Sequence, residues 1–250
     1  MEDKIYGTNS VLEALNSGRE IDKIFILEGA RHSRLGEITS LAKKRHIHYT
    51  LTSRKKLDEM ADGGNHQGVL AFAAMQSYVD VSDILDAAKQ RGEDPFILIA
   101  EGLKDPHNLG SIIRCANAAG AHGVIIPKNR SVGLNATVSK VSAGAVEYTP
   151  VARVTNIASV IDQLKKAGVW VAGTALEESS LYTEANLTGP LAIVIGSEGE
   201  GLSRLTREKC DFLVKIPMLG QAESLNASVA AGILLYEAVR QRQAKAKKEG

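Results

Sequence analysis

Two runs of five apolar residues constrain the fold of this chain more than any other feature. Phe96–Ala100 (FILIA) and Leu191–Ile195 (LAIVI) contain no polar side chain. A strand with one solvent face alternates polar and apolar residues, so these two runs are predicted to be strands buried on both faces. Such strands are typical of a parallel sheet that helices cover on each side.

The sequence around these runs supplies the rest of the sheet and its helices. Further strands are predicted at 123–126, 169–173 and 212–216, and helices at 109–119, 135–143, 157–167, 203–209 and 224–242. The fold class is therefore α/β, with residues 95–243 forming one domain around a parallel sheet. The last helix is apolar nearly all round from Ala227 to Leu235, which favours burial on several sides and contact with a second subunit.

The first 76 residues are predicted to form a smaller α/β unit. Strands are expected at 23–27, 48–51 and 68–73, and helices at 9–17, 33–45 and 54–61. Residues 77–94 are acidic and carry one predicted helix at 82–90, so they are predicted to link the two units. Residues 244–250 are predicted to be a basic tail.

Composition excludes several classes of protein. The 250 residues contain no run of about 18 apolar residues, which a membrane-spanning helix needs. Residues 1–4 (MEDK) lack an apolar stretch, so no signal peptide is expected. Two cysteines, Cys115 and Cys210, favour a reducing cytoplasm, and together with six scattered histidines they argue against a structural metal site.

Basic residues gather in one part of a chain whose net charge is only +1. Eight lysines and arginines lie between residues 31 and 56, and Glu37 alone opposes them. Concentrated positive charge attracts nucleic acid because binding releases its counterions. The alternative is a set of solvated helix faces, which is also the interpretation of the basic residues at 240–248. The candidates for RNA contact in this stretch are Lys43, Lys44, Arg45, Arg54 and Lys55.

Unusual residues follow three predicted strands, at the ends where open α/β sheets bind ligands. After 96–100 come Asn108, a candidate helix N-cap, and Arg114, which lies off the apolar stripe of its helix. After 191–195 comes the turn 196–201 (GSEGEG), whose glycines allow a ligand to approach the backbone. After 212–216 come Ser224, a second candidate cap, and Asn226, expected inside the first helical turn.

Several other types of site are not supported. The turn 196–201 is neither a dinucleotide-binding fingerprint nor a phosphate-binding loop with Gly-Lys-Ser/Thr. No nucleophile elbow and no Cys–His pair is evident, and Glu198 and Glu200 lack further acids nearby. Considered one at a time, Asn108 and Ser224 could each be present only as helix caps. Their common position at one rim of the sheet is what indicates a site.

The three segments together resemble the three motifs of the SpoU (TrmH-like) RNA ribose 2′-O-methyltransferases of the SPOUT superfamily. The matching stretches are 108–114 (NLGSIIR), 195–201 (IGSEGEG) and 216–228 (IPMLGQAESLNAS). Their order and spacing agree with the family, and the resemblance covers essentially the whole chain. The N-terminal unit, ending in 65–69 (NHQGV), resembles the L30e-like substrate-binding domain of the 23S rRNA guanosine-2′-O-methyltransferase branch.

This resemblance implies a catalytic domain with a deep trefoil knot, S-adenosylmethionine as cofactor bound in that knot, and a homodimer. The implied cofactor contacts are Gly196, Ile216 and Leu225, and the implied active site consists of Asn108, Arg114, Glu198, Ser224 and Asn226. The resemblance of the N-terminal unit adds His66 and Gln67 to the expected RNA contacts. No metal is required.

The implied reaction is methylation of a ribose 2′-hydroxyl, on a guanosine of 23S rRNA. DNA lacks this hydroxyl, so the expected partner is RNA and not DNA. The alternatives are a tRNA ribose methyltransferase, a non-catalytic RNA-binding or ribosome-assembly protein and, more weakly, a nucleotide-dependent α/β enzyme. The family suggests Arg114 as general base, but a guanidinium normally stays protonated, so holding a phosphate is an equally good role.

Overall fold

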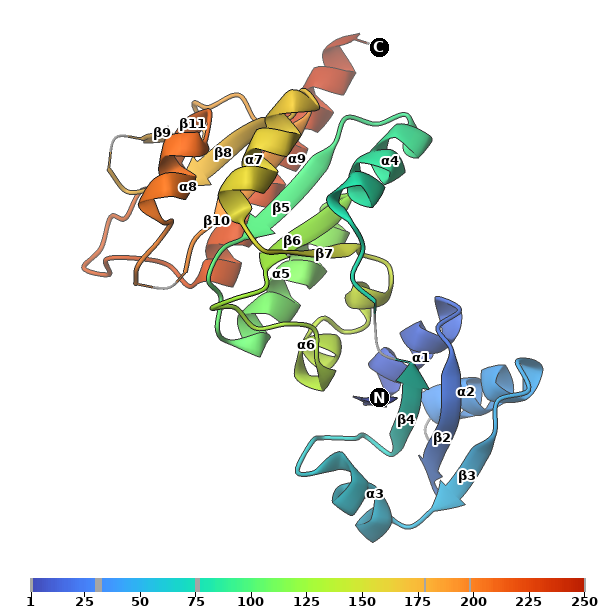
Figure 1. The fold of residues 1–250 in the computed structure, drawn as a ribbon. Helices are drawn as coiled ribbons and strands as arrows, with labels where there is room; N and C mark the ends of the chain where they lie inside the picture. Colours follow the sequence, from blue (N-terminus) through green and yellow to red (C-terminus); the bar gives the residue numbers. More distant parts are fainter. Residues whose placement is uncertain (1, 30–32, 75–76, 178, 198, 250) are drawn as a thin grey trace. The chain divides into compact units, whose positions relative to one another are not determined.

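A computed structural model describes the chain except for residues 1, 30–32, 75–76, 178, 198 and 250. The chain divides into two compact units (Figure 1). The first consists of Met1–Ser77 with Leu134–Tyr148, and the second of Tyr78–Gly133 with Thr149–Gly250. Each unit has its own sheet and its own hydrophobic core.

The second unit is built on a seven-stranded sheet in which every strand pair is parallel. Its order is β7-β6-β5-β10-β8-β11-β9, with β5 (Phe96–Ala100), β6 (Gly123–Pro127), β7 (Val151–Val154), β8 (Trp170–Thr174), β9 (Ser180–Leu181), β10 (Leu191–Ile195) and β11 (Phe212–Lys215). The two apolar runs are neighbours at the centre, and all their residues are buried. The predicted α/β fold with a parallel sheet is confirmed.

Helices cover both faces of this sheet (Figure 1). On one face α4 (Val81–Arg91) and α7 (Ile157–Lys166) pack onto alternate strand residues such as Ile97, Ile99 and Val194, and α8 (Arg204–Lys209) lies next to α7. On the other face α5 (Pro106–Ala118) packs against α9 (Ala227–Glu249), and α9 contacts β10. Burial of both faces explains why β5 and β10 contain no polar residue.

The order of the strands reverses at the centre of the sheet, so that the strands on the two sides of β10 are laid down in opposite directions across the sheet. Strands β5, β6 and β7 follow one another toward one edge, whereas β8 lies beyond β10, and β11 and β9 lie farther out. After β11 the chain returns to α9 against β10 and α5. A crevice for ligands forms outside the carboxyl ends of strands at such a switch point. The trefoil knot stays a prediction from the family resemblance.

The first unit has a mixed four-stranded sheet in the order β1-β4-β2-β3, in which only β2 and β3 are parallel. Its elements are β1 (Glu2–Tyr6), α1 (Thr8–Asn16), β2 (Ile21–Leu27), α2 (Ser33–Lys44), β3 (Tyr49–Thr52), α3 (Arg54–Ala61) and β4 (Val69–Ala74). Helices α1 and α2 enclose the larger core cluster and α3 the smaller one. Strand β1 was not predicted, because its charged sequence carries little apolar periodicity.

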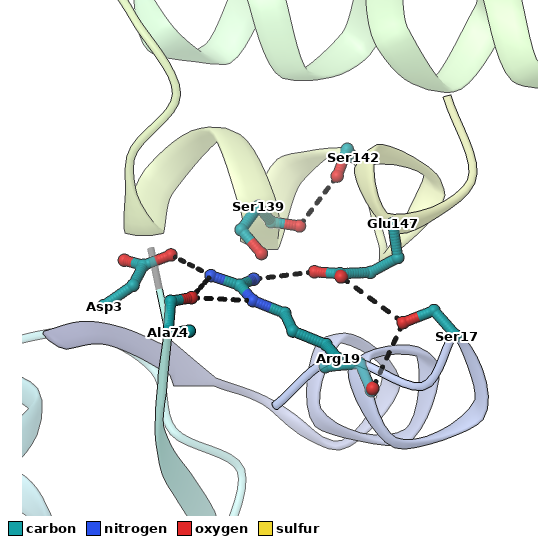
Figure 2. Close-up of polar contacts among 8 residues, drawn as sticks. Asp3, Ser17, Arg19, Ala74, Ser139, Ser142 and Glu147 are labelled. Carbon is teal, nitrogen blue, oxygen red and sulfur yellow. Dashed lines mark hydrogen bonds and ion pairs between the residues drawn. The ribbon is translucent and has the colours of Figure 1, made fainter. Parts of the chain in front are cut away.

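Residues 134–148, which contain α6 (Ala136–Val141) and the short 3₁₀ helix η1 (Ala145–Glu147), belong to the first unit. Figure 2 shows the ion pairs that hold them there. The guanidinium of Arg19 lies 2.8 Å from Glu147 and 2.8 Å from Asp3, and it also donates to the carbonyl of Ala74. Burial raises the pKa of the Glu147 carboxyl, and the positive charge of Arg19 opposes that rise.

Three predicted boundaries differ from the structure. Residues 78–94 are part of the second unit and not a linker, because Val81 and Ile84 of α4 lie in its core and Val79 bridges to Ala152. The acidic residues that suggested a linker are all exposed, either on α4 or directly before and after it. Residues 134–148, expected within the domain 95–243, belong to the first unit, and α9 extends to Glu249 without a separate tail from 244.

Candidate active site

Two predicted site residues from distant parts of the sequence are joined by a hydrogen bond in the second unit. The Nδ2 group of Asn226 donates to Oδ1 of Asn108 over 2.9 Å, although the residues are 118 positions apart. Asn108 lies in the first turns of α5, after β5, and Asn226 directly precedes α9. The contact therefore brings the first and third predicted segments together, as one site requires.

Asn108 does not cap its helix as expected. Helix α5 begins with Pro106, and the carboxylate of Asp105 caps it by accepting from the N–H of His107 at 2.9 Å. Proline suits the first helical position because an N–H there would have no acceptor within the helix, so its absence costs no hydrogen bond. Asn108 consequently lies inside the helix and is buried.

Asn226, and not Ser224, provides the cap at the other helix. Its Oδ1 accepts from the N–H of Ser228 at 2.9 Å and of Val229 at 3.3 Å, which satisfies two otherwise unpaired donors of α9. The side chain of Asn226 thus acts with both ends, since Oδ1 holds the helix while Nδ2 holds Asn108.

The turn 196–201 after β10 is closed on itself. Ser197 and Gly201 exchange backbone hydrogen bonds of 3.1 and 3.0 Å. A Cβ atom on Gly196 would stand 2.2 Å from the carbonyl carbon of Gly201, so this position admits only glycine. Gly199 and Gly201 have φ values of +87° and +65°, and apart from their chain neighbours no described residue has an atom within 4 Å of where their Cβ atoms would stand. Glu198, predicted to be catalytic, lies outside the described residues.

A cavity of about 290 Å³, hereafter cavity A, opens on one side of this turn. Among the residues that line it are the three predicted cofactor contacts Gly196, Ile216 and Leu225, and also Ser224. Their role in binding stays a prediction, but the structure does bring them to one cavity. Sequence reasoning missed Thr174, Ala175 and Leu176, which also line it. These residues lie at and directly after the carboxyl end of β8, where an open α/β sheet binds ligands, so their position after a predicted strand could have identified them.

A larger cavity of about 540 Å³, hereafter cavity B, also lies against this turn. Its lining comes from the segments that follow β5, β6, β7 and β10, and it includes Asn108 and Glu200. Ser197 and Gly201 line both cavities. The two cavities are therefore neighbours that meet at Ser197 and Gly201.

Arg114 lines neither cavity. Its side chain is exposed on α5, whereas Asn108 of the same helix is buried and lines cavity B. A single copy of the chain thus places Asn108 in cavity B and Ser224 in cavity A, joins Asn226 to Asn108 by a hydrogen bond, and leaves Arg114 on the exposed side of α5.

The predicted RNA contacts of the first unit fall into two groups. Lys43, Lys44, Arg54 and Lys55 are exposed. The first two end α2 before β3, and the other two begin α3 after β3, so these pairs lie toward opposite ends of that strand. The basic stretch that is continuous in sequence is therefore divided in space.

The other three predicted RNA contacts have structural partners in the same unit. His66 is buried, accepts from the N–H of Gly68 at 2.9 Å and contacts Asp58 at 2.9 Å. Oε1 of Gln67 accepts from the N–H and the hydroxyl of Thr8, both at 3.1 Å. Arg45 donates to the carbonyls of Leu15 and Arg19. Sequence cannot distinguish such internal hydrogen bonds from contacts to a ligand.

Other reactive groups are few. Among the described residues no group of three or more histidine, cysteine or acidic side chains could hold a metal ion, and no described helix is long and apolar enough to cross a membrane. Burial raises the pKa of the Cys210 thiol to about 12, so this cysteine is a poor nucleophile at neutral pH.

Comparison with known families assigns both parts of the chain. The profile of the SpoU rRNA methylase family matches residues 95–236, and that of the RNA 2′-O ribose methyltransferase substrate-binding domain matches residues 4–79. YacO of Bacillus subtilis, assigned to the TrmH family of tRNA/rRNA methyltransferases, is 49% identical over 240 residues, which is 96% of each chain.

Solved structures also resemble this chain over nearly its whole length. The SpoU methyltransferase AviRb of Streptomyces viridochromogenes, in complex with AdoMet, has a TM-score of 0.82 at 27% identity and covers 97% of this chain and 91% of its own. A structure described as an RNA 2′-O ribose methyltransferase has a TM-score of 0.79 at 31% identity, over 97% of this chain and 89% of its own.

Proposed function

This chain belongs to the SpoU rRNA methylase family of RNA methyltransferases, and we propose that it transfers a methyl group from S-adenosylmethionine to a ribose 2′-hydroxyl of a guanosine in 23S rRNA. The observation that carries this proposal is the convergence of the three motif segments. They surround two adjoining cavities, and the hydrogen bond between Asn108 and Asn226 joins the first segment to the third.

Cavity A suits S-adenosylmethionine. Its volume of about 290 Å³ is close to the lower end of the range of small-molecule pockets. Ile216, Met218 and Leu225 provide apolar lining, and the open sides of Gly199 and Gly201 let a ligand contact the backbone. The carboxylate of Glu223 also lines the cavity and would favour a cationic ligand. When bound, the cofactor supplies an electrophilic methyl group.

The residues of the chain must hold the ribose hydroxyl in line and help it to lose its proton. The Asn108–Asn226 pair fixes the rim between the cavities, because Asn226 is itself fixed as the cap of α9. Arg114 would hold a phosphate and lower the pKa of the hydroxyl through its positive charge. A role as general base would require a very large shift from the ordinary guanidinium pKa.

Arg114 would reach a substrate best in a homodimer. Val229 and Tyr236 of α9 are 49% and 52% exposed, on a helix whose Ala231, Leu234 and Leu235 are fully buried. An apolar helix face that the chain itself leaves open is typical of a subunit interface. Since α5 packs beside α9, an interface on this face would bring Arg114 close to a second subunit.

Methyl transfer from radiolabelled cofactor to undermodified 23S rRNA and to bulk tRNA tests the proposed function. We expect label in 23S rRNA, at the 2′-oxygen of a guanosine. Label in tRNA alone would overturn the choice of substrate, and label in neither would favour a non-catalytic RNA-binding protein.

The Arg114→Lys variant should lose most of its activity, because an ammonium cannot reproduce the paired contacts of a guanidinium. Full activity with an unchanged pH profile would contradict a requirement for the guanidinium.

A further inference from the structure

We propose that cavity B receives the target nucleotide, with its base against Leu205 and Pro127 and its phosphate held by Lys104 and Arg130. This inference rests on the proposed function and extends it, because these four residues lie outside the three motif segments. The volume of about 540 Å³ lies within the range of cavities that bind small ligands.

The position of cavity B suits the reacting nucleotide. Ser197 and Gly201 line both cavity B and cavity A. Asn108, which Asn226 holds, belongs to its lining. A nucleotide in cavity B would therefore lie directly beside a methyl donor in cavity A, on the side where the motif residues meet.

Some polar groups of cavity B already have structural roles. The carboxylate of Glu101 accepts from the N–H of Ser203 at 3.1 Å and from the hydroxyls of Ser203 and Thr206 at 2.9 and 2.8 Å. Asp105 caps α5. These hydrogen bonds fix the two carboxylates at the starts of α8 and α5 but leave their negative charges in place, so a phosphate in cavity B would have to lie against Lys104 and Arg130.

Other polar groups at the rim have no such role. Lys104, Asn129, Arg130 and Glu200 line the cavity with exposed side chains, and they form no hydrogen bond or ion pair with any other described residue. The backbone brings the two cations together, because the N–H of Val132 donates to the carbonyl of Leu103 at 2.7 Å. This hydrogen bond ties the loop of Arg130 to the loop of Lys104. Two unpaired cations on tied loops suit a phosphodiester.

The apolar side of the cavity suits a base. Leu205 is 51% exposed at the start of α8, although it lies beside a polar rim. With Pro127 it offers an apolar surface that a flat ring would cover. Glu200 offers an acceptor for the N–H groups of a base edge and would repel phosphate, which favours a base near Glu200 and a phosphate near Lys104 and Arg130.

Paired variants test the assignment in the full-length protein. Arg130→Ala and Leu205→Ala remove a cavity residue each. Lys128→Ala and Leu51→Ala are matched controls, because Lys128 and Leu51 are exposed and line neither cavity. We expect Arg130→Ala to lower kcat/KM for RNA by about tenfold through loss of a charged hydrogen bond. Leu205→Ala should lower it by about tenfold through loss of contact with the base.

Cofactor affinity, measured by calorimetry, should stay close to wild type in all four variants. Equal losses in Arg130→Ala and Lys128→Ala would overturn the proposal, because they would indicate general attraction of RNA and no specific site. Loss of cofactor binding in Arg130→Ala or Leu205→Ala would also overturn it, since cavity B would then be part of the cofactor site.

A binding measurement separates this proposal from the proposed function. Guanosine 5′-monophosphate, in the presence of S-adenosylhomocysteine, is titrated into the wild type, Arg130→Ala and Lys128→Ala and followed by NMR. We expect weaker binding only in Arg130→Ala, even if the wild type methylates no RNA that is tested. Equal binding by all three proteins, or binding by none, would contradict the assignment of cavity B, whatever the outcome of the methylation assay.

Discussion

At the scale of single residues, Asn226 has two tasks that one side chain performs at once. Its oxygen caps α9 and its amide nitrogen holds Asn108. The sequence pointed to both asparagines as site residues, but it assigned the caps to Asn108 and Ser224. Local propensity cannot decide which of several neighbouring capping residues begins a helix, because Ser, Asp and Asn are all good caps.

Substitution of Asn226 separates these two tasks. Asn226→Asp keeps the capping oxygen and replaces the amide donor, so it should retain stability while methyl transfer falls by about tenfold or more, because Asn108 loses its fixed position. Asn226→Ala should lose the activity and also about 1 kcal/mol of stability. Thermal unfolding and kcat measure the two effects. Equal stability losses in both variants would contradict the capping role.

His122 predicts a pH dependence of stability. It is 1% exposed, accepts from the N–H of Phe96 at 3.0 Å and contacts Glu93 at 3.0 Å. Burial lowers its pKa below the value of 6.5 for a free histidine, although Glu93 opposes this shift. The unfolded chain therefore takes up a proton before the folded one does, so stability is fully present above pH 6.5 and falls as the pH decreases below it.

Urea unfolding between pH 7.5 and 5 measures this dependence. The variant His122→Asn preserves an acceptor near Phe96 and cannot titrate, so its stability should decline less over the same range. An identical decline in wild type and variant would show that other groups cause it.

At the scale of elements, a buried ion pair holds the segment 134–148 in the first unit. The segment lies between β6 and β7 of the second unit in sequence, yet Arg19 and Glu147 hold it in the first (Figure 2). The side chains of this pair are 8% and 3% exposed. The chain therefore crosses between the units at 77/78, 133/134 and 148/149, and not through one linker.

Removal of one partner of this pair should be costly. Arg19→Met leaves the Glu147 carboxylate buried without its cation and should lower the free energy of unfolding by about 3–5 kcal/mol. The double variant Arg19→Met/Glu147→Met removes both charges and should recover most of that loss. Urea unfolding of the two variants tests this. A double variant no more stable than Arg19→Met would mean that the packing of Arg19, and not its charge, holds the segment.

At the scale of the whole molecule, the chain combines two sheets of different construction. The parallel sheet places the ends of β5, β8, β10 and β11 around two adjoining cavities. The mixed sheet of the first unit displays exposed lysines and arginines at both ends of β3. In the proposed function the first unit binds the phosphate backbone of the RNA, which positions the RNA without reading its base sequence.

The proposed homodimer has a direct test at this scale. Val229→Asp/Tyr236→Asp places two charges on the open face of α9, and these would be buried without partners in an interface. We expect the wild type to be dimeric and the double variant monomeric by light scattering, with methyl transfer largely lost. A variant that stays dimeric would exclude this face of α9 as the interface.

Sequence alone determined the parallel sheet, the small N-terminal α/β unit and the three segments of the site, because each of these depends on local apolar patterns and on residues that directly follow strands. Tertiary structure decided which side chains meet. The Asn108–Asn226 contact, the placement of 134–148 in the first unit and the internal bonding of Arg45 and Gln67 depend on contacts between distant parts of the chain. Their partners lie far outside any local period, so only the folded path of the backbone selects them.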